Sequence, residues 1–353
     1  MLRRKNLILI IPLAVLLLSL VIKGVSDHKA YNETKQRLFS MYAHTTYRND
    51  TPAPEIADTA KKEFTEMARR EDPGIALQAV ESAAKSDSAA VDYCHLLTHE
   101  IGHVAYEKYG DFSKAMQYQN NVCNSGFLHG VIESHFPKSE NVFSDMETVC
   151  ARDRLGSLSS VNCYHGVGHG LMYYTSNDLP RSLDMCDSYG NEFARSHCSI
   201  GVFMENVNTD GKLHPSKFIR EDNLFYPCGE QELHFKHECY FYTAKRYLTL
   251  YPDDYIGALR WCEGAEIFFR STCAKAVGGY AMKRNSDSPK YVEGVCMSNK
   301  KSQRSPCLDG MVIFTVSYFR SLESAEALCA QLEPYNQRAC HRAVRAKSSL
   351  FAD

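Results

Sequence analysis

The chain has 353 residues, with 40 Lys and Arg against 42 Asp and Glu, so its formal net charge is -2. This near-neutral balance gives no electrostatic reason to expect nucleic acid as a partner, and we expect none. With 44% hydrophobic and 23% charged residues, the composition is that of a globular protein and excludes a disordered chain. The unusual value is the 14 cysteines, which indicate an oxidising compartment unless the thiols bind metal.

The N-terminal residues 1–26 predict a membrane-targeting segment. A basic cluster at residues 3–5 precedes an uncharged apolar run at residues 7–22. This run is shorter than the roughly 20 residues of a membrane span, and longer than the about 7–15 residues of a signal-peptide core. We interpret it as an uncleaved signal anchor with a cytoplasmic N-terminus, and a cleaved signal peptide is the alternative. In either case the remaining chain is expected to face the periplasm, the lumen or the cell exterior, where disulfides form.

Three further parts are expected after this segment. Residues 27–54 are polar, end in a Pro-Ala-Pro sequence and are interpreted as a stalk. Residues 55–210 are expected to form N-terminal helical repeats that carry the candidate site residues. Residues 211–353 are expected to form C-terminal helical repeats held by disulfides. They are separated from the preceding part because metal-ligating residue types are missing from the matching helix positions there.

The cysteines from Cys150 onward are regularly spaced. They form six couples whose members are 11 to 13 residues apart: Cys150/Cys163, Cys186/Cys198, Cys228/Cys239, Cys262/Cys273, Cys296/Cys307 and Cys329/Cys340. The second cysteines of successive couples are 35, 41, 34, 34 and 33 residues apart, and a step near 34 is typical of helical-hairpin repeats. We predict one disulfide across each hairpin, because the couples lack the C-x₂-C spacing of zinc ribbons. Cys94 and Cys123 remain, and since 14 is an even number they can pair with each other.

With this period and these couples, residues 90–345 resemble the secreted cysteine-rich SEL-like repeat proteins, which are relatives of tetratricopeptide arrays. The resemblance implies an all-α fold, a disulfide-stapled array of helical hairpins that curves into a solenoid. Such arrays have a concave groove, and a peptide or protein ligand in it is one partner that we expect, besides the membrane. The resemblance implies nothing about chemistry.

The histidines cluster in the second helices of the first three repeats. His95, His99 and His103 follow Cys94, His129 and Glu133 follow Cys123, and His165 and His169 follow Cys163. At about 100° per residue from each cysteine, all but His95 lie on one helix face, with His95 at its margin and Glu205 of the next repeat off it. Equivalent faces of successive repeats line one surface, so we expect these side chains to converge on a divalent metal. Zinc is the first expectation, iron, manganese and copper are alternatives, and the number of ligands allows two metals.

His99-Glu100-Ile-Gly-His103 also matches the H-E-x-x-H motif. In the zincin metallopeptidases both histidines bind zinc, and the glutamate activates the zinc-bound water. This resemblance implies that His99 and His103 are ligands and that Glu100 is the general base. No third ligand follows at the usual zincin spacings, so it would come from His129, His165 or His169.

The sequence therefore predicts a membrane-anchored, extracytoplasmic metalloprotein that acts as a metal-dependent enzyme with Glu100 or Glu133 as its base. We prefer hydrolysis to oxidation because of the H-E-x-x-H motif. One alternative is a metal-binding or sensing protein without turnover. The other is a helical-repeat scaffold for protein interactions.

Overall fold

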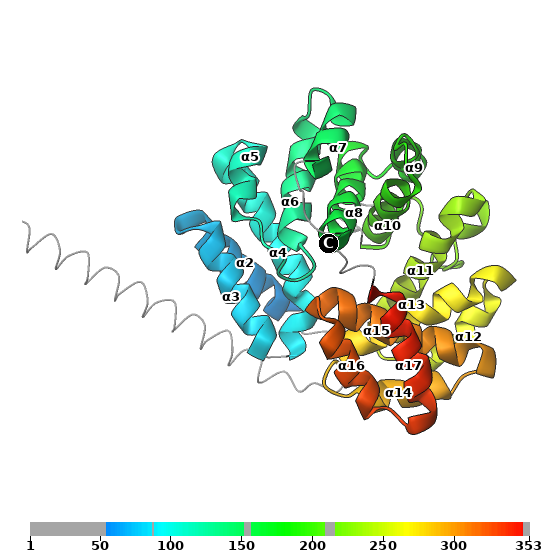
Figure 1. Cartoon of the computed structure of the whole chain (residues 1–353). Coiled ribbons are helices and arrows are strands. Elements are labelled where there is room, and N and C mark those ends of the chain that lie inside the picture. Colours follow the sequence, from blue (N-terminus) through cyan, green and yellow to red (C-terminus); the bar gives the residue numbers. More distant parts are fainter. Residues whose placement is uncertain (1–53, 87, 152–156, 209–215, 349–353) are drawn as a thin grey trace, which may run out of the picture. The chain divides into compact units, whose positions relative to one another are not determined.

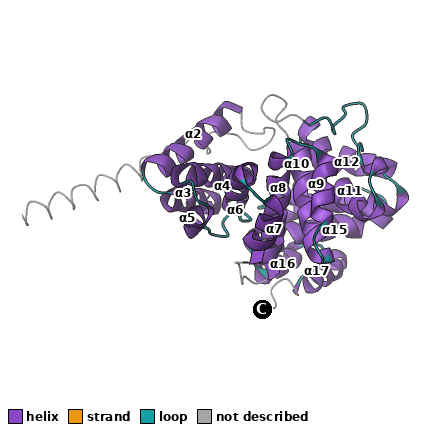
Figure 2. Cartoon of the chain, turned by 90° about the horizontal axis from the view of Figure 1, so that it is seen from above, coloured by secondary structure: helices purple, strands orange, loops and turns teal. Residues whose placement is uncertain are grey.

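The computed structural model describes residues 54–86, 88–151, 157–208 and 216–348, and over these ranges it contains helices and no strands (Figures 1 and 2). The predicted all-α class is therefore confirmed for the described residues. The predicted signal anchor at residues 1–26 lies outside them, as does the predicted stalk except for Pro54. None of the described helices is both long and apolar enough to span a membrane.

The helices follow one another with short connections. The first are α2 (Pro54–Arg70), α3 (Pro73–Ser86), α4 (Ser88–Tyr109), α5 (Phe112–Ala115), α6 (Gly126–His135), α7 (Val142–Ala151), α8 (Ser157–Tyr174), α9 (Leu179–Asp187) and α10 (Glu192–Asn208). The others are α11 (Leu233–Leu250), α12 (Tyr255–Trp261), α13 (Arg270–Arg284), α14 (Pro289–Met297), α15 (Lys301–Phe319), α16 (Leu322–Gln331) and α17 (Pro334–Ala346). Hairpins of a shorter and a longer helix are α7–α8, α9–α10, α12–α13, α14–α15 and α16–α17.

Local sequence signals begin several of the shorter helices. The side chains of Asp178, Asp254 and Ser321 each accept a hydrogen bond from the backbone N–H three residues later, at the starts of α9, α12 and α16. Such caps satisfy one of the backbone donors that a helix leaves unpaired at its N-terminus. Proline occupies the first turn of α9 and α14, where its missing N–H costs no helical hydrogen bond.

The cysteines are bonded in consecutive pairs along the chain. The six predicted couples from Cys150/Cys163 to Cys329/Cys340 are all disulfides, and so is Cys94/Cys123. Bonded partners have Cα atoms 5.5 to 5.6 Å apart, all of these cysteines are buried, and none is free. The disulfide prediction is therefore confirmed, and the bonds form part of the hydrophobic core.

The longer helices pack on one another in chain order, from α4 through α6, α8, α10, α11, α13 and α15 to α17. Two hydrophobic clusters form the core on either side of α11, and each contains several disulfides. The described residues all belong to one compact unit, within which α13 also contacts α4. Side chains on successive longer helices are therefore neighbours, which is the arrangement that lets ligands from different repeats meet.

Glycines bring certain longer helices into backbone contact. A Cβ atom on Gly102 of α4 would lie 2.3 Å from the carbonyl oxygen of Phe127, and one on Gly130 of α6 would lie 2.0 Å from that of His99. The same reciprocal contact joins Gly168 to Gly201 between α8 and α10, and Gly278 to Gly310 between α13 and α15. The third pair lies in the half of the chain without candidate ligands, so the glycines serve the scaffold in general. In α4 to α10 the close approach also brings imidazoles within reach of one another.

Candidate metal centre

Four consecutive longer helices, α4, α6, α8 and α10, bring His and Glu side chains together. Three overlapping groups have ligand atoms that all lie within 4.8 Å of one another: His95/His99/His129, His129/His165/His169 and Glu133/His169/Glu205. Each group could hold a metal ion. The structure thus gathers five of the six predicted metal ligands and one of the two predicted bases. His103 and Glu100 belong to no such group among the described residues.

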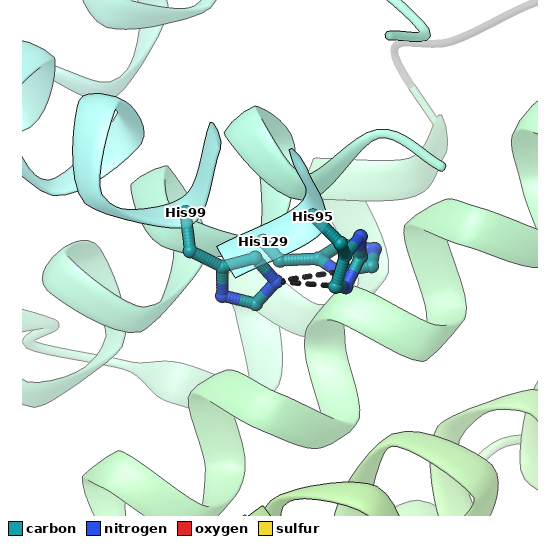
Figure 3. A group of neighbouring side chains, drawn as sticks. All are labelled: His95, His99 and His129. Carbon is teal, nitrogen blue, oxygen red and sulfur yellow. Dashed lines mark hydrogen bonds between the residues drawn. The ribbon is translucent and has the colours of Figure 1, made fainter. Parts of the chain in front are cut away.

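The group His95/His99/His129, drawn in Figure 3, has the spacing of metal ligands. The Nε2 atom of His99 lies 3.0 Å from Nε2 of His95 and 3.2 Å from Nδ1 of His129. Nitrogen ligands that bind one ion with bonds of about 2.0–2.1 Å lie about 2.8 to 3.4 Å from each other in octahedral or tetrahedral geometry. Both contacts fall within that range.

In the rings of His95 and His129, the outer nitrogen, which is the one that does not face His99, contacts a backbone carbonyl. These contacts fix which ring nitrogens carry protons. Nδ1 of His95 lies 2.6 Å from the carbonyl oxygen of Cys123, and Nε2 of His129 lies 2.9 Å from that of Asn162. A carbonyl oxygen only accepts hydrogen bonds, so both outer nitrogens donate. In the neutral rings, Nε2 of His95 and Nδ1 of His129 therefore present lone pairs to His99. Metal-bound histidines are oriented by outer hydrogen bonds of this kind.

Burial keeps these two rings neutral. The pKa of His95 and the pKa of His129 are held well below their ordinary value, first by burial and then by the neighbouring histidines. One proton on Nε2 of His99 can satisfy only one of the two lone pairs that face it. A divalent cation would satisfy all three nitrogens, and leaving a buried polar atom unpaired costs about 1–3 kcal/mol.

Glu133 lies between His99 and His103. Its Oε2 accepts a hydrogen bond from Nε2 of His103 at 2.5 Å, and its Oε1 lies 2.9 Å from Nδ1 of His99. The second contact is an electrostatic one, because Oε1 is buried and the contact lacks the geometry of a hydrogen bond. A carboxylate at this place favours the proton on Nδ1 of His99 and leaves its Nε2 as a ligand atom.

The charges of Glu133 and His103 support each other. Burial alone would raise the pKa of Glu133, but attraction to His99 and the hydrogen bond from His103 hold that pKa well below its usual value. Burial alone would lower the pKa of His103, but the hydrogen bond and the charge of Glu133 raise it. Glu133 is therefore an ionised carboxylate that is only 2% exposed.

The imidazole of His169 on α8 is fully buried and lies between the carboxylates of Glu133 and Glu205 on one side and the imidazole of His165 on the other. Its Nδ1 lies 2.8 Å from Oε2 of Glu205 and 3.6 Å from Oε1 of Glu133. Its Nε2 lies 3.0 Å from Nε2 of His165, whose pKa is lowered well below the ordinary value by burial and then by His169. The ring of His129 stacks on both His165 and His169, so the groups form one continuous cluster.

The expectation that Glu205 lies off the shared face is wrong, because Glu205 contacts His169. Gly201, one turn earlier on α10, abuts the carbonyl oxygen of His165. Gly201 and Glu205 therefore lie on the side of α10 that packs against α8. The pattern Gly-x-x-x-Glu is the signal in the sequence that could have identified this residue. The carbonyl partners Cys123 and Asn162 have no such signal, because any residue type offers a carbonyl.

The H-E-x-x-H motif is arranged differently from a zincin site. Glu100 pairs with Lys61 of α2 at 2.5 Å, and its other oxygen lies 3.9 Å from Nδ1 of His103. The neighbours of Nε2 of His99 are His95 and His129, not His103. The structure therefore brings His99 together with His95, one turn earlier on α4, and with His129 of α6.

Comparisons with protein-family models, with curated proteins and with solved structures found no match to this chain.

Proposed function

We propose that this chain is an extracytoplasmic metalloprotein that binds a divalent transition metal through Nε2 of His95, Nε2 of His99 and Nδ1 of His129. The observation that carries the proposal is the convergence of these three nitrogens at 3.0 and 3.2 Å, with two of the rings tied by outer N–H groups to backbone carbonyls. A set of neutral imidazoles suits zinc, copper and iron better than magnesium or calcium. We expect zinc, with copper, iron and manganese as the ions to compare.

The disulfides and the N-terminal segment support the location in this proposal. Seven disulfides are stable in an oxidising compartment, and residues 1–26 have the basic cluster and apolar run of a signal anchor. The disulfide-bonded hairpins pack on one another in chain order, as the hairpins of a solenoid do. Such a scaffold would hold the ligands of different repeats in place.

Metal-dependent hydrolysis is the second candidate function, and the three-nitrogen ligand set favours it. Catalytic zinc sites use three protein ligands and keep one position open, where the metal supplies an activated water. Of the two predicted bases, Glu133 is the one that contacts a proposed ligand, with its Oε1 2.9 Å from Nδ1 of His99, the ring nitrogen opposite the proposed ligand atom Nε2. Glu100 is occupied by Lys61, which makes it the weaker candidate for the base.

Metal analysis of the purified, chelator-dialysed and reconstituted chain tests the proposal. The wild-type protein is expected to retain zinc, and His99→Ala is expected to weaken its binding by at least about 100-fold. His234→Ala is the matched control, because His234 is a half-exposed histidine that lies beside Asp187. If the folded wild-type chain retains none of zinc, copper, iron or manganese, the metalloprotein proposal is wrong and an interaction scaffold remains.

A further inference from the structure

A second set of ligand atoms lies beside the first and shares no residue with it. Glu133 of α6, His169 of α8 and Glu205 of α10 have ligand atoms that lie within 4.8 Å of one another, and Nδ1 of His169 faces Oε1 of Glu133 and Oε2 of Glu205. All three residues are buried: Glu133 is 2% exposed, His169 is 0% exposed and Glu205 is 8% exposed. The set contains two carboxylates and one imidazole, which is a harder ligand set than three imidazoles.

The protein atoms alone leave this set incompletely paired. One N–H at Nδ1 of His169 can serve Oε2 of Glu205, at 2.8 Å, and then Oε1 of Glu133 at 3.6 Å receives nothing from it. That oxygen is buried and accepts no hydrogen bond in the described structure. The buried carboxylates of Glu133 and Glu205 both face Nδ1 of His169, whose single proton cannot serve both, and a divalent cation at this place would bind all three groups and compensate both charges.

The competing group His129/His165/His169 is the weaker candidate. His129 donates through Nε2 to the carbonyl of Asn162, and its Nδ1 already faces His99, so neither nitrogen is left for a further ion. His169 can instead donate through Nε2 to the neutral ring of His165, at 3.0 Å. In that tautomer Nδ1 of His169 has its lone pair between the two carboxylates.

We propose that Glu133, His169 and Glu205 bind a second divalent metal, of a kind that accepts mixed oxygen and nitrogen ligands, such as Mn²⁺ or Fe²⁺. The inference extends the proposed function from one ion to a two-metal centre, but its ligands are a separate set. The two positions are linked by the 2.9 Å contact between His99 and Glu133 and by the packing of the His99 and His169 rings. Paired metals of this kind occur in hydrolases, where they stabilise attacking and leaving oxygens.

The test uses Mn²⁺ and Zn²⁺ as probes on the full chain. The wild-type protein is expected to bind two ions per chain in metal analysis and calorimetric titration. Glu205→Gln is expected to bind one, because the neutral amide is a poor ligand for a hard cation. Glu238→Gln is the matched control: Glu238 is a similarly buried glutamate on the next longer helix, α11, and belongs to no ligand group in the described ranges.

Crystals of the wild-type chain soaked separately in Mn²⁺ and in Zn²⁺ provide a readout that does not depend on how a variant folds, and a position counts as occupied if either ion gives a peak there. Anomalous scattering at both positions supports both proposals. A peak only at Glu133/His169/Glu205 supports this inference and overturns the His95/His99/His129 site. A peak only at His95/His99/His129, or an unchanged ion count in folded Glu205→Gln, overturns the second site and leaves the first. Absence of bound metal in both experiments overturns both.

Discussion

The carbonyl oxygen of His99 occupies the space that a side chain on residue 130 would need. The ideal Cβ position on Gly130 lies 2.0 Å from that oxygen and 3.0 Å from the Cα of His99. Gly130→Ala therefore cannot fit unless α4 and α6 separate, which moves His99 away from His129. We expect this substitution to destabilise the chain by about 1–3 kcal/mol, the usual cost of overpacking, and to weaken metal binding.

Gly294→Ala is the control for this prediction. Gly294 is also helical, in α14, but no atom lies within 4 Å of its ideal Cβ position. Alanine there is expected to stabilise the helix by up to about 1 kcal/mol. Denaturant unfolding of both variants measures the difference, and equal effects of the two substitutions would contradict the packing argument.

His103→Ala separates the present geometry from a zincin-type site. In a zincin His103 is a ligand, and its loss removes the metal. Here His103 only donates to Glu133, so we expect His103→Ala to keep its zinc with an affinity lowered by about 10-fold to 100-fold. Competition with a zinc chelator measures this affinity, with His99→Ala as the reference for full loss. A His103→Ala protein as metal-free as His99→Ala would restore the zincin interpretation.

The Cys94–Cys123 disulfide holds the carbonyl that orients His95. Cys123 accepts from Nδ1 of His95, and the disulfide fixes Cys123 to the residue before His95. A Cys94→Ala/Cys123→Ala chain is therefore expected to bind zinc about 10-fold more weakly, as for other losses of an orienting partner.

The Cys329→Ala/Cys340→Ala chain is the matched control for the disulfide prediction. Its bond closes the last hairpin, between α16 and α17, and its loss is expected to cost about 2–4 kcal/mol of stability without changing zinc affinity. Titration of zinc into both chains under conditions where both are folded decides the point. Equal zinc affinities would show that the Cys94–Cys123 bond has no role at the site.

The metal-free chain is expected to lose stability on mild acidification. The pKa values of four histidines are lowered in the folded state, mainly by burial: His95, His129, His165 and His197. A base with a lowered folded pKa stabilises the fold fully above its unfolded pKa, near 6.5, and this contribution is lost as the pH falls below that value. His103, whose pKa is raised, opposes them, because its contribution is complete below pH about 6.5.

The net effect is measured as the free energy of unfolding of the chelated chain at pH 7.5 and at pH 5.5. Each of the four histidines contributes a loss of up to about 1.4 kcal/mol per pH unit, so stability is expected to be clearly lower at pH 5.5. An unchanged or higher stability at pH 5.5 would contradict the neutral state that the site needs.

The fold could be predicted where the sequence repeats a physical requirement. A disulfide needs two cysteines at a fixed separation across a hairpin, so the spacing from Cys150 to Cys340 predicts both the hairpins and their bonds. The same spacing supplied the reference for the helical wheel that placed His99, His129 and His169 on one face. These three side chains do lie in one continuous cluster in the structure.

The remainder of the site depends on how one helix is turned toward the next. A wheel centred on Cys198 treats α10 alone, and it cannot show that Gly201 and Glu205 face α8. The wheel centred on Cys94 likewise places His99 and His103 of α4 on one face. In the structure, α6 crosses α4 at Gly130, His99 lies beside His129, and His103 donates to Glu133. Such rotations arise from packing between repeats, which a single helix does not encode.

The pairing of the cysteines in consecutive couples along the chain has a consequence for biosynthesis. From Cys94 to Cys340 no disulfide encloses or crosses another. Each bond can therefore form as soon as its second cysteine emerges during synthesis, before any later cysteine is present to compete. Oxidation in the order of synthesis gives the native pairing without a disulfide isomerase having to reshuffle bonds.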